Sequence, residues 1–276
     1  RFSGTGFIYF RMYCDSMARS QSKKKRPRRE DKVDKVERKL ESDVFDRQSL
    51  MAISKLRQQG LFDTVDYPIA KGKEANIFCA TTSSGEKVAI KIYRIETSNF
   101  IRMHDYIDGD PRFANTSKKR FETLLAWTRK EYSNLKAFYE AGIAVPRPLG
   151  FLRNIVVMEF FGEGSIAFST LDQLGSDHPQ KDYEFLLSQV KKIYQIGFVH
   201  SDFSPYNIVV TDDGLKLLDC AQAVLLAHPR AEDFLRRDME NLVKYFKKQG
   251  ANADFDEAMK YIKDGKPVKR GLEALW

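Results

Sequence analysis

The chain has 276 residues, of which 42% are hydrophobic and 30% are charged, and its formal net charge is +8. No apolar run approaches the roughly 20 residues that a membrane-spanning helix needs, so we expect a protein without a membrane segment. The three cysteines (Cys14, Cys79 and Cys220) are odd in number and lack CxxC spacing, which argues against a disulfide framework or a zinc site and favours the cytoplasm.

The positive charge is concentrated near the beginning of the chain. Residues 1–39 hold 13 Lys or Arg against 5 Asp or Glu, so they account for the entire net charge. We interpret residues 1–16 as a non-native or disordered leader, and 17–45 as a basic tail with the start of a helix. The basic residues within 19–39 suit the phosphate backbone of a nucleic acid. The alternative is a solvated extension without a specific partner.

Periodicity and turn residues predict an α+β chain whose first half combines helices with short strands. The predicted elements are, in order, helices over 31–44 and 46–59, strands over 68–70, 75–80 and 87–93, a helix over 117–140 and interrupted strands over 151–161. Residues 81–86 are predicted to form a hairpin turn. Residues 96–117 are polar and show no clear pattern, and a loop of this length is usually functional or disordered.

The second half is predicted to be mainly helical. After a flexible connector at 162–164, the expected elements are helices over 182–196, 231–249 and 254–264, and a β-hairpin formed by 207–210 and 215–218. Strands come first and helices dominate later. This order predicts a small β-rich lobe over 46–161 and a helical lobe over 162–276.

The string His-Ser-Asp-Phe-Ser-Pro-Tyr-Asn, from His200 to Asn207, carries the strongest chemical signal. Asp202 and Asn207 have the spacing of a phosphoryl-transfer loop, in which the Asp orients the acceptor and the Asn binds a metal ion. Asp219 ends the returning strand of the next hairpin, where its carboxylate is expected to chelate Mg²⁺. Asn207 could instead cap a turn. His200 is interpreted as a packing residue that supports the loop.

Lys91 ends the strand sequence Val-Ala-Ile-Lys, in which a lysine contacts the α- and β-phosphates of ATP. A lysine between apolar neighbours needs a carboxylate partner when it is buried. We predict Glu131 as this partner, with Glu122 as the alternative on the same helix. The competing interpretation is an edge-strand lysine that points to solvent.

Two more segments are assigned to the nucleotide. The turn at 72–74 precedes a strand and lies where a loop over the phosphates belongs, and the segment 158–161 fits a lobe hinge whose backbone reads adenine. The residues assigned to ATP are therefore Gly72, Lys73, Glu74, Lys91, Glu131, Met158, Glu159 and Phe161. A simple β-turn and an ordinary buried strand end are the respective alternatives.

Two motifs that ordinary protein kinases carry after the metal-binding aspartate are absent after Asp219. The next residues are Cys220 and Ala221 instead of Phe-Gly, no Ala-Pro-Glu follows, and only 57 residues remain. This is too short for the activation segment and peptide-binding helices of ordinary protein kinases. A standard platform for peptide substrates is therefore not expected.

The combination of motifs resembles the RIO family of atypical serine/threonine kinases, in particular its compact archaeal Rio1 type, over about residues 45–265. The segments that carry the resemblance are Gly72–Asn76, Ala89–Ser98, Trp127–Glu131, Met158–Phe160, His200–Asn207 and Leu218–Val224. It implies a two-lobed protein-kinase-like fold that lacks the activation segment and peptide-binding helices. It also implies that 96–117 form a mobile loop near the nucleotide.

The resemblance further implies the activity and its partners. The cofactors would be ATP and Mg²⁺, with Mn²⁺ as a substitute, and Asp219 could carry a transient aspartyl phosphate. The partner would be a maturing small ribosomal subunit, contacted through ribosomal proteins and through rRNA at the tail 19–39, by a monomer. Two departures from the family pattern are Ala70-Lys71, where Ser-Thr is usual, and Ala221, where glycine is usual.

Two alternatives remain at this point. A small-molecule phosphotransferase of the aminoglycoside or choline kinase kind shares the spacing from His200 to Asn207 and a later Asp, but usually builds an acidic substrate pocket in a larger helical lobe. A ribosome-binding scaffold gated by nucleotide would have no chemical need to keep Lys91, Asp202, Asn207 and Asp219 together.

Overall fold

The computed structural model describes residues 47–95, 98–164 and 166–265. The leader, the basic tail and the helix predicted over 31–44 lie outside the described residues. The described chain forms two compact units. Unit 1 contains the residues up to Ser98 together with Gly150–Val157, and unit 2 contains Asn99–Leu149 and the residues from Met158 onward.

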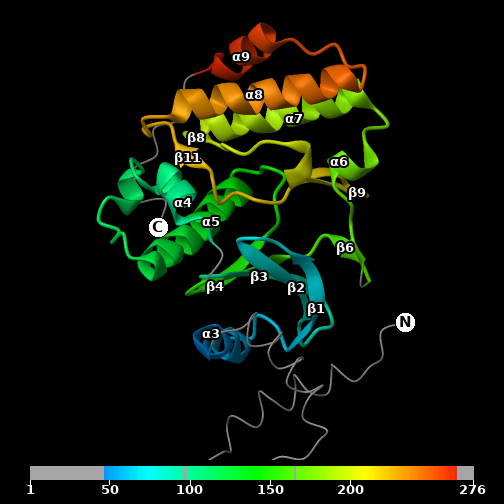
Figure 1. The fold of residues 1–276 in the computed structure, drawn as a ribbon. Helices are drawn as coiled ribbons and strands as arrows, with labels where there is room; N and C mark the ends of the chain where they lie inside the picture. Colours follow the sequence, from blue (N-terminus) through cyan, green and yellow to red (C-terminus); the bar gives the residue numbers. More distant parts are fainter. Residues whose placement is uncertain (1–46, 96–97, 165, 266–276) are drawn as a thin grey trace, which may run out of the picture. The chain divides into compact units, whose positions relative to one another are not determined.

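Unit 1 consists of a β-sheet and one helix (Figure 1). Its elements are α3 (Arg47–Gln58), β1 (Thr64–Lys71), β2 (Ala75–Thr81), β3 (Lys87–Tyr93), β4 (Pro148–Leu152) and β5 (Ile155–Glu159). The first two residues of β4 and the last two of β5 belong to unit 2. The strand order is β1-β2-β3-β5-β4, which places β3 in the middle of the sheet. The Asn154 amide donates to Ser49 Oγ and to the Tyr93 carbonyl, both at 2.8 Å, and so ties α3 to the sheet.

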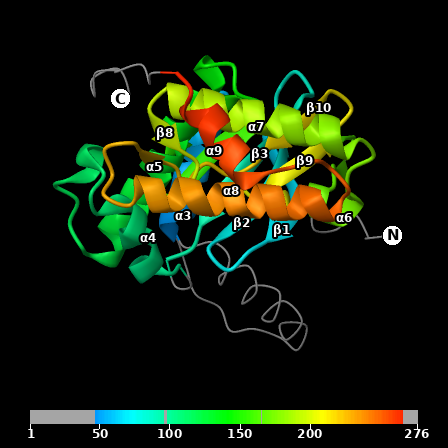
Figure 2. The same ribbon diagram turned by 90° about the horizontal axis from the view of Figure 1, so that it is seen from above.

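Unit 2 is mainly helical. Its helices are α4 (Phe100–Ile107), η1 (Pro111–Phe113), α5 (Arg120–Glu140), α6 (Leu171–Leu174), α7 (Pro179–Gln195), η2 (Pro205–Asn207), α8 (Ala231–Lys248) and α9 (Phe255–Lys263). Its short strands are β6 (Gly162–Glu163), β7 (Ile166–Ala167), β8 (Phe198–Val199), β9 (Ile208–Thr211), β10 (Gly214–Leu217) and β11 (Val224–Leu225). Figure 2 shows α9 lying over the pair formed by α7 and α8. The order of strands and helices confirms the predicted α+β class.

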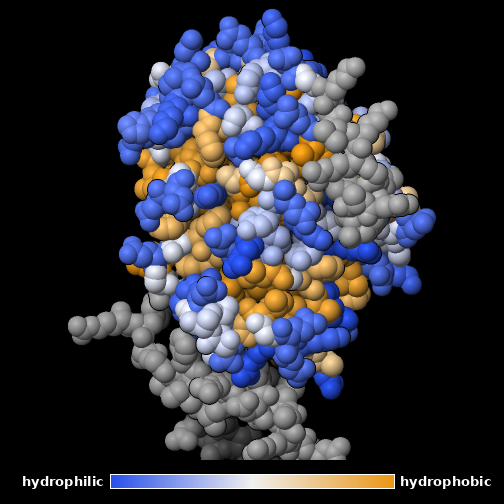
Figure 3. Space-filling view, turned by 180° about the vertical axis from the view of Figure 1, so that it is seen from behind, coloured by the Kyte–Doolittle hydropathy of each residue, from blue (hydrophilic) through white to orange (hydrophobic). Residues whose placement is uncertain are grey.

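The buried residues of α8 explain why this helix packs as it does. Leu235, Met239, Leu242 and Phe246 recur every three or four positions and Phe234 lies next to the first of them, so together they form one apolar stripe that faces the interior of unit 2. Figure 3 shows that the surface over the end of unit 2 formed by α7–α9 consists mainly of hydrophilic side chains. No helix within the described ranges is long and apolar enough to cross a membrane.

The segment 96–117 differs from the structureless loop that we expected, because it contains α4 and η1. The Asn99 side chain accepts from the main-chain N–H of Arg102 and caps α4. Tyr106 is buried and stacks on Phe234 with ring centroids 5.1 Å apart. The helix was missed because it has only two turns and its stabilising contacts come from distant residues. The mobility of this segment stays a prediction.

The two units do not coincide with the two lobes predicted on either side of residue 162, because α5 belongs to unit 2. The helix is tied there by polar side chains as well as by apolar packing. Lys130 and Asn134 are both 0% exposed and form hydrogen bonds to the main chain just after Asp219. Burial lowers the pKa of Lys130 well below its usual range, and the charge of Arg112 adds to this effect.

Candidate active site

A β-hairpin brings Asn207 and Asp219 together in unit 2. The strands β9 and β10 are antiparallel, with Leu217 opposite Ile208, so the residues before β9 and after β10 lie at the same end. At that end the N–H of Leu218 donates to the carbonyl of Asn207 at 2.9 Å. The hairpin, which was predicted, therefore accounts for the proximity of two residues that are 12 positions apart.

A second antiparallel pair aligns the predicted catalytic loop (residues 200–207) with the segment after Asp219. In β8 and β11, Val199 lies opposite Val224 and Phe198 lies opposite Leu225. The loop that begins at His200 therefore starts beside the residues that follow Asp219. Both strands have only two residues, and neither was predicted.

The backbone of the catalytic loop is held by Asp238, which lies on α8. Ser201 has a left-handed backbone (φ 66°), and its N–H and that of Phe203 donate to the two carboxylate oxygens of Asp238 at 2.7 and 3.0 Å. The guanidinium of Arg237 also donates to the Ser201 carbonyl. Burial raises the pKa of Asp238 to about 7, although the two main-chain donors oppose this rise.

Asp202 is oriented by two amide side chains. Its Oδ2 accepts hydrogen bonds from Asn207 Nδ2 and from Gln222 Nε2, both at 2.8 Å. Because both donors converge on Oδ2, Oδ1 is the oxygen left to face an acceptor group. Burial raises the pKa of Asp202, and the negative charge of Asp219 contributes to the same shift.

The oxygen atoms at this site fit a hard cation. Asn207 directs its Nδ2 at Asp202, so its Oδ1 faces away from that carboxylate and can bind a metal ion. Asp219 Oδ1 accepts from the N–H of Ala221 at 2.9 Å, which orients the second carboxylate. Within the described residues no cluster of three or more His, Cys, Asp or Glu is suited to a metal. Mg²⁺ usually binds one or two protein side chains together with phosphate oxygens and water, and Asn207 and Asp219 would fit this pattern.

His200 is a buried packing residue, as predicted. It is 1% exposed and its ring meets that of Phe203 edge-on, with centroids 5.4 Å apart. Burial lowers the pKa of His200 to about 4, although the nearby Asp219 opposes this shift. The ring is therefore neutral at physiological pH.

Ala221 fits its position without strain. Among the described residues, Arg153 and Ser201 are the non-glycine residues with a positive φ, so Ala221 does not need the conformational freedom of glycine. The backbone at this position is therefore one that alanine adopts as readily as glycine.

The predicted phosphate-binding residues of unit 1 lie on β3 and in the turn before β2. Lys91 is in the central strand and is 7% exposed, which contradicts the alternative of an edge-strand lysine in solvent. Its Nζ lies 5.1 Å from the centre of the Tyr93 ring. Gly72 donates its N–H to the Ala75 carbonyl, and a Cβ at Gly72 would lie 2.9 Å from that oxygen, so this tight turn requires glycine. Lys73 and Glu74 belong to the same turn.

The predicted adenine hinge lies in unit 2. Met158 is buried, and the N–H of Glu159 donates to the Arg147 carbonyl at 2.9 Å. The Phe161 carbonyl accepts from the N–H of Phe168 at 3.1 Å. Backbone readout of adenine would therefore use the Glu159 carbonyl and the Phe161 N–H.

Burial separates the two candidate partners of Lys91. Glu131 is 1% exposed, whereas Glu122 is exposed. Both carboxylates lie on α5 in unit 2, whereas Lys91 lies in unit 1. The structure thus brings together Asp202, Asn207 and Asp219, while the pairing of Lys91 with Glu131 stays a prediction.

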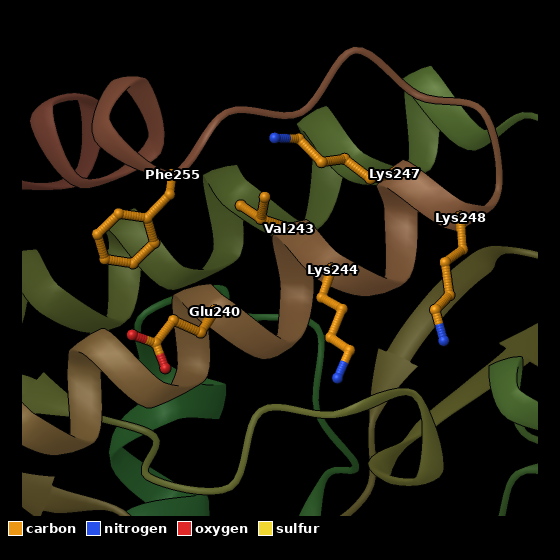
Figure 4. Close-up of a pocket in the computed structure, with 6 residues that line it drawn as sticks. All are labelled: Glu240, Val243, Lys244, Lys247, Lys248 and Phe255. Atoms are coloured by element: carbon orange, nitrogen blue, oxygen red, sulfur yellow. The ribbon is translucent and has the colours of Figure 1, made fainter.

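A hollow of about 420 Å³ between α8 and the start of α9 does not coincide with these residues. Figure 4 shows Val243 between Phe255 and Lys247, with Lys244 and Lys248 extending in a common direction from α8. None of the predicted site residues lines this hollow, so it is not the candidate active site.

Gln222 and Asp238 were not identified from the sequence. Gln222 lies inside the segment Leu218–Val224, which contributed to the family resemblance. As the amide side chain of that segment, it was a visible candidate for a hydrogen-bond donor to Asp202. Asp238 lies 36 residues after Asp202 and resembles any other polar position of a helix. Only the folded chain shows that this carboxylate is buried.

Comparisons with known proteins agree with this geometry. A family model described as RIO domain matches residues 76–258. The RIO-type serine/threonine-protein kinase Rio1 of Haloferax volcanii is 41% identical over 224 residues, which cover 81% of this chain and 77% of that protein. The Rio1 kinase of Methanocaldococcus jannaschii is 33% identical, with coverage of 86% and 81%.

A solved structure shows the same fold. The Rio2 kinase of Chaetomium thermophilum, crystallised as an ADP/Mg²⁺-phosphoaspartate complex, superposes with a TM-score of 0.62 and is 23% identical. The match covers 82% of this chain and 70% of that one. This confirms the two-lobed kinase-like fold that was predicted.

The low pKa of His200 predicts a specific pH dependence of stability. The folded state resists protonation between about pH 6.5 and 4, so the contribution of His200 to stability is lost as the pH falls through this window. Between pH ~7.5 and ~5 the wild type should therefore lose about 2 kcal/mol more unfolding free energy than His200→Phe. Denaturant titrations at both pH values measure this difference. Parallel pH profiles for the two proteins would contradict the buried, neutral ring.

Asp238→Asn should loosen the catalytic loop. An amide can accept only one of the two main-chain hydrogen bonds and would direct its NH₂ at the other donor, so we expect a loss of about 1–3 kcal/mol in unfolding free energy. Catalytic turnover should fall as well. Glu240→Gln, an exposed carboxylate on the same helix, is the matched control and should change neither quantity. Wild-type stability in Asp238→Asn would show that the two hydrogen bonds do not hold the loop.

Proposed function

Since the chain belongs to the RIO family of atypical serine/threonine-protein kinases, we propose that it is a Mg²⁺-dependent ATP phosphotransferase that acts in the maturation of the small ribosomal subunit. The observation that carries the chemistry is the convergence of Asp202, Asn207 and Asp219: Asn207 donates to Asp202, and the bond from the Leu218 N–H to the Asn207 carbonyl closes the end of the β9–β10 hairpin beside Asp219. Family membership decides against a small-molecule phosphotransferase of the aminoglycoside or choline kinase kind.

The roles of the residues follow from their geometry. Asp202 presents Oδ1 to the acceptor hydroxyl while two amides fix Oδ2, so it orients the acceptor and can take its proton. Asn207 and Asp219 would hold Mg²⁺, which neutralises charge on the phosphate oxygens. Lys91, paired with Glu131, would hold the α- and β-phosphates. The turn 72–74 would cover the phosphates.

The acceptor of the phosphoryl group is proposed from the related Rio2 complex. That kinase was crystallised with ADP, Mg²⁺ and a phosphoaspartate, and Asp219 is the carboxylate of this chain that would lie nearest the γ-phosphate. A transient phosphate on Asp219, followed by hydrolysis, would make the chain an ATPase. Autophosphorylation or phosphorylation of a Ser or Thr is the other form of the same activity.

The partners and location are part of the proposal. The basic residues within 19–39 would contact rRNA, and ribosomal proteins would complete the binding site for a monomeric, cytoplasmic protein. A scaffold that is gated by nucleotide and has no turnover is the alternative that the next experiment tests.

Asp202→Ala should lower ATP turnover by roughly 10²-fold or more, because the acceptor loses its orienting carboxylate. Mg²⁺-dependent turnover is measured with and without purified pre-small-subunit particles. Asp213→Ala removes an exposed carboxylate at the turn of the β9–β10 hairpin and should keep wild-type turnover. Equal turnover by wild type and Asp202→Ala would refute the catalytic assignment and favour the scaffold.

Deletion of residues 17–39 should weaken binding to rRNA and flatten its salt dependence. Each Lys or Arg that neutralises a phosphate releases counterions, so the slope of log K against log salt falls when these contacts are removed. Fluorescence titrations at several salt concentrations measure the slope. Deletion of residues 1–16 is the control, and an unchanged slope after deletion of 17–39 would show that the tail is only solvated.

A further inference from the structure

The segment that follows Asp219 is fixed through its main-chain carbonyls. Asn134 Nδ2 donates to the carbonyls of Cys220 and Ala223 at 2.8 and 2.9 Å. Lys130 Nζ donates to the Ala221 carbonyl at 2.9 Å and also to that of Ala223. Two side chains from α5 thus satisfy three carbonyls within four residues of the Mg²⁺-binding Asp219.

Lys130 is an unusual residue in this position. Its side chain is among the largest that are fully buried, and besides the carbonyls its Nζ lies 5.6 Å from the centre of the Trp127 ring. Burying an amine is costly unless its hydrogen bonds are satisfied. An apolar side chain would fill the same space at lower cost, so the carbonyl contacts are what the lysine adds.

The orientation of Asn134 is also fixed. Arg112 Nη1 donates to Asn134 Oδ1 at 2.9 Å, which turns Nδ2 toward the carbonyls. Arg112 is itself held by a two-point ion pair with Asp110, at 3.0 and 2.7 Å, and both side chains are 0% exposed. A continuous buried network therefore runs from the segment after α4, through α5, to the residues after Asp219.

We propose that Lys130 and Asn134 are positioning residues of the metal site, which hold the carbonyls of residues 220–223 so that Asp219 is preorganised for Mg²⁺. The inference rests on the proposed role of Asp219. It adds an assignment for Lys130, which the reaction scheme above does not use.

The test is metal binding without turnover. Mn²⁺ affinity of the full chain in the presence of ADP is measured by electron paramagnetic resonance for wild type, Lys130→Met, Asn134→Leu and Lys136→Met. Residues that orient metal ligands typically contribute roughly 10–100-fold to metal affinity, so the first two variants should lose at least ~10-fold. Lys136→Met, on the exposed side of α5, should bind as the wild type does. The affinity for ADP without metal should be unchanged in all four proteins.

The outcomes separate this inference from the proposed function. If the wild type binds Mn²⁺·ADP and Lys130→Met folds and binds it equally well, the positioning role is wrong while the metal site stands. If a variant loses as much affinity for metal-free ADP as for Mn²⁺, the inference is also wrong, because the substitution would then damage nucleotide binding as a whole and not the metal site. If the wild type binds no Mn²⁺ with ADP, both the proposed metal site and the inference fail.

A measurement on the wild type covers the case in which the variants do not fold. The N–H of Ala221 donates to Asp219 Oδ1, and that of Ala223 donates to the Cys220 carbonyl at 3.2 Å. If the segment is held before metal binds, both amides should exchange slowly with deuterium in the metal-free protein. Exchange as fast as in an unstructured peptide would overturn the inference.

Discussion

The site depends on one constraint: main-chain polar groups that are buried outside helices and sheets must find hydrogen bonds elsewhere. The catalytic loop presents N–H groups, at Ser201 and Phe203, and the carboxyl oxygens of Asp238 accept their hydrogen bonds. The segment after Asp219 presents carbonyls, and the amine of Lys130 and the amide of Asn134 donate to them. The chemical type of each buried side chain thus matches the polarity of the backbone that it supports.

This arrangement explains why distant parts of the chain share one function. The hairpin β9–β10 fixes the distance between Asn207 and Asp219, but it cannot fix the direction of the loops at its ends. That direction comes from α5 on one side and α8 on the other. Both helices are anchored by apolar stripes, so a few polar residues on them can hold the loops rigidly. Stability and preorganisation of the site therefore have a common source.

Sequence patterns predicted what is encoded locally. The hairpin before Asp219 and the long helices are visible over short ranges of the sequence, and the structure confirms them. The roles predicted from the spacing of Asp202 and Asn207 stay a prediction. Asp238, Lys130 and the two-residue strands β8 and β11 escaped prediction, because their partners are main-chain atoms, which carry no residue identity.

The residues after Asp219 can be small because α5 holds their main chain. In this chain the support acts on the carbonyls of Cys220, Ala221 and Ala223, so their side chains need not anchor the loop. Gln222 is the exception, and its side chain bonds to Asp202. The segment thus contacts α5 through its backbone and the catalytic carboxylate through one side chain. A displacement of the segment would move Asp219 and disturb Asp202 together, so under the proposed roles it would couple metal binding to the orientation of the acceptor.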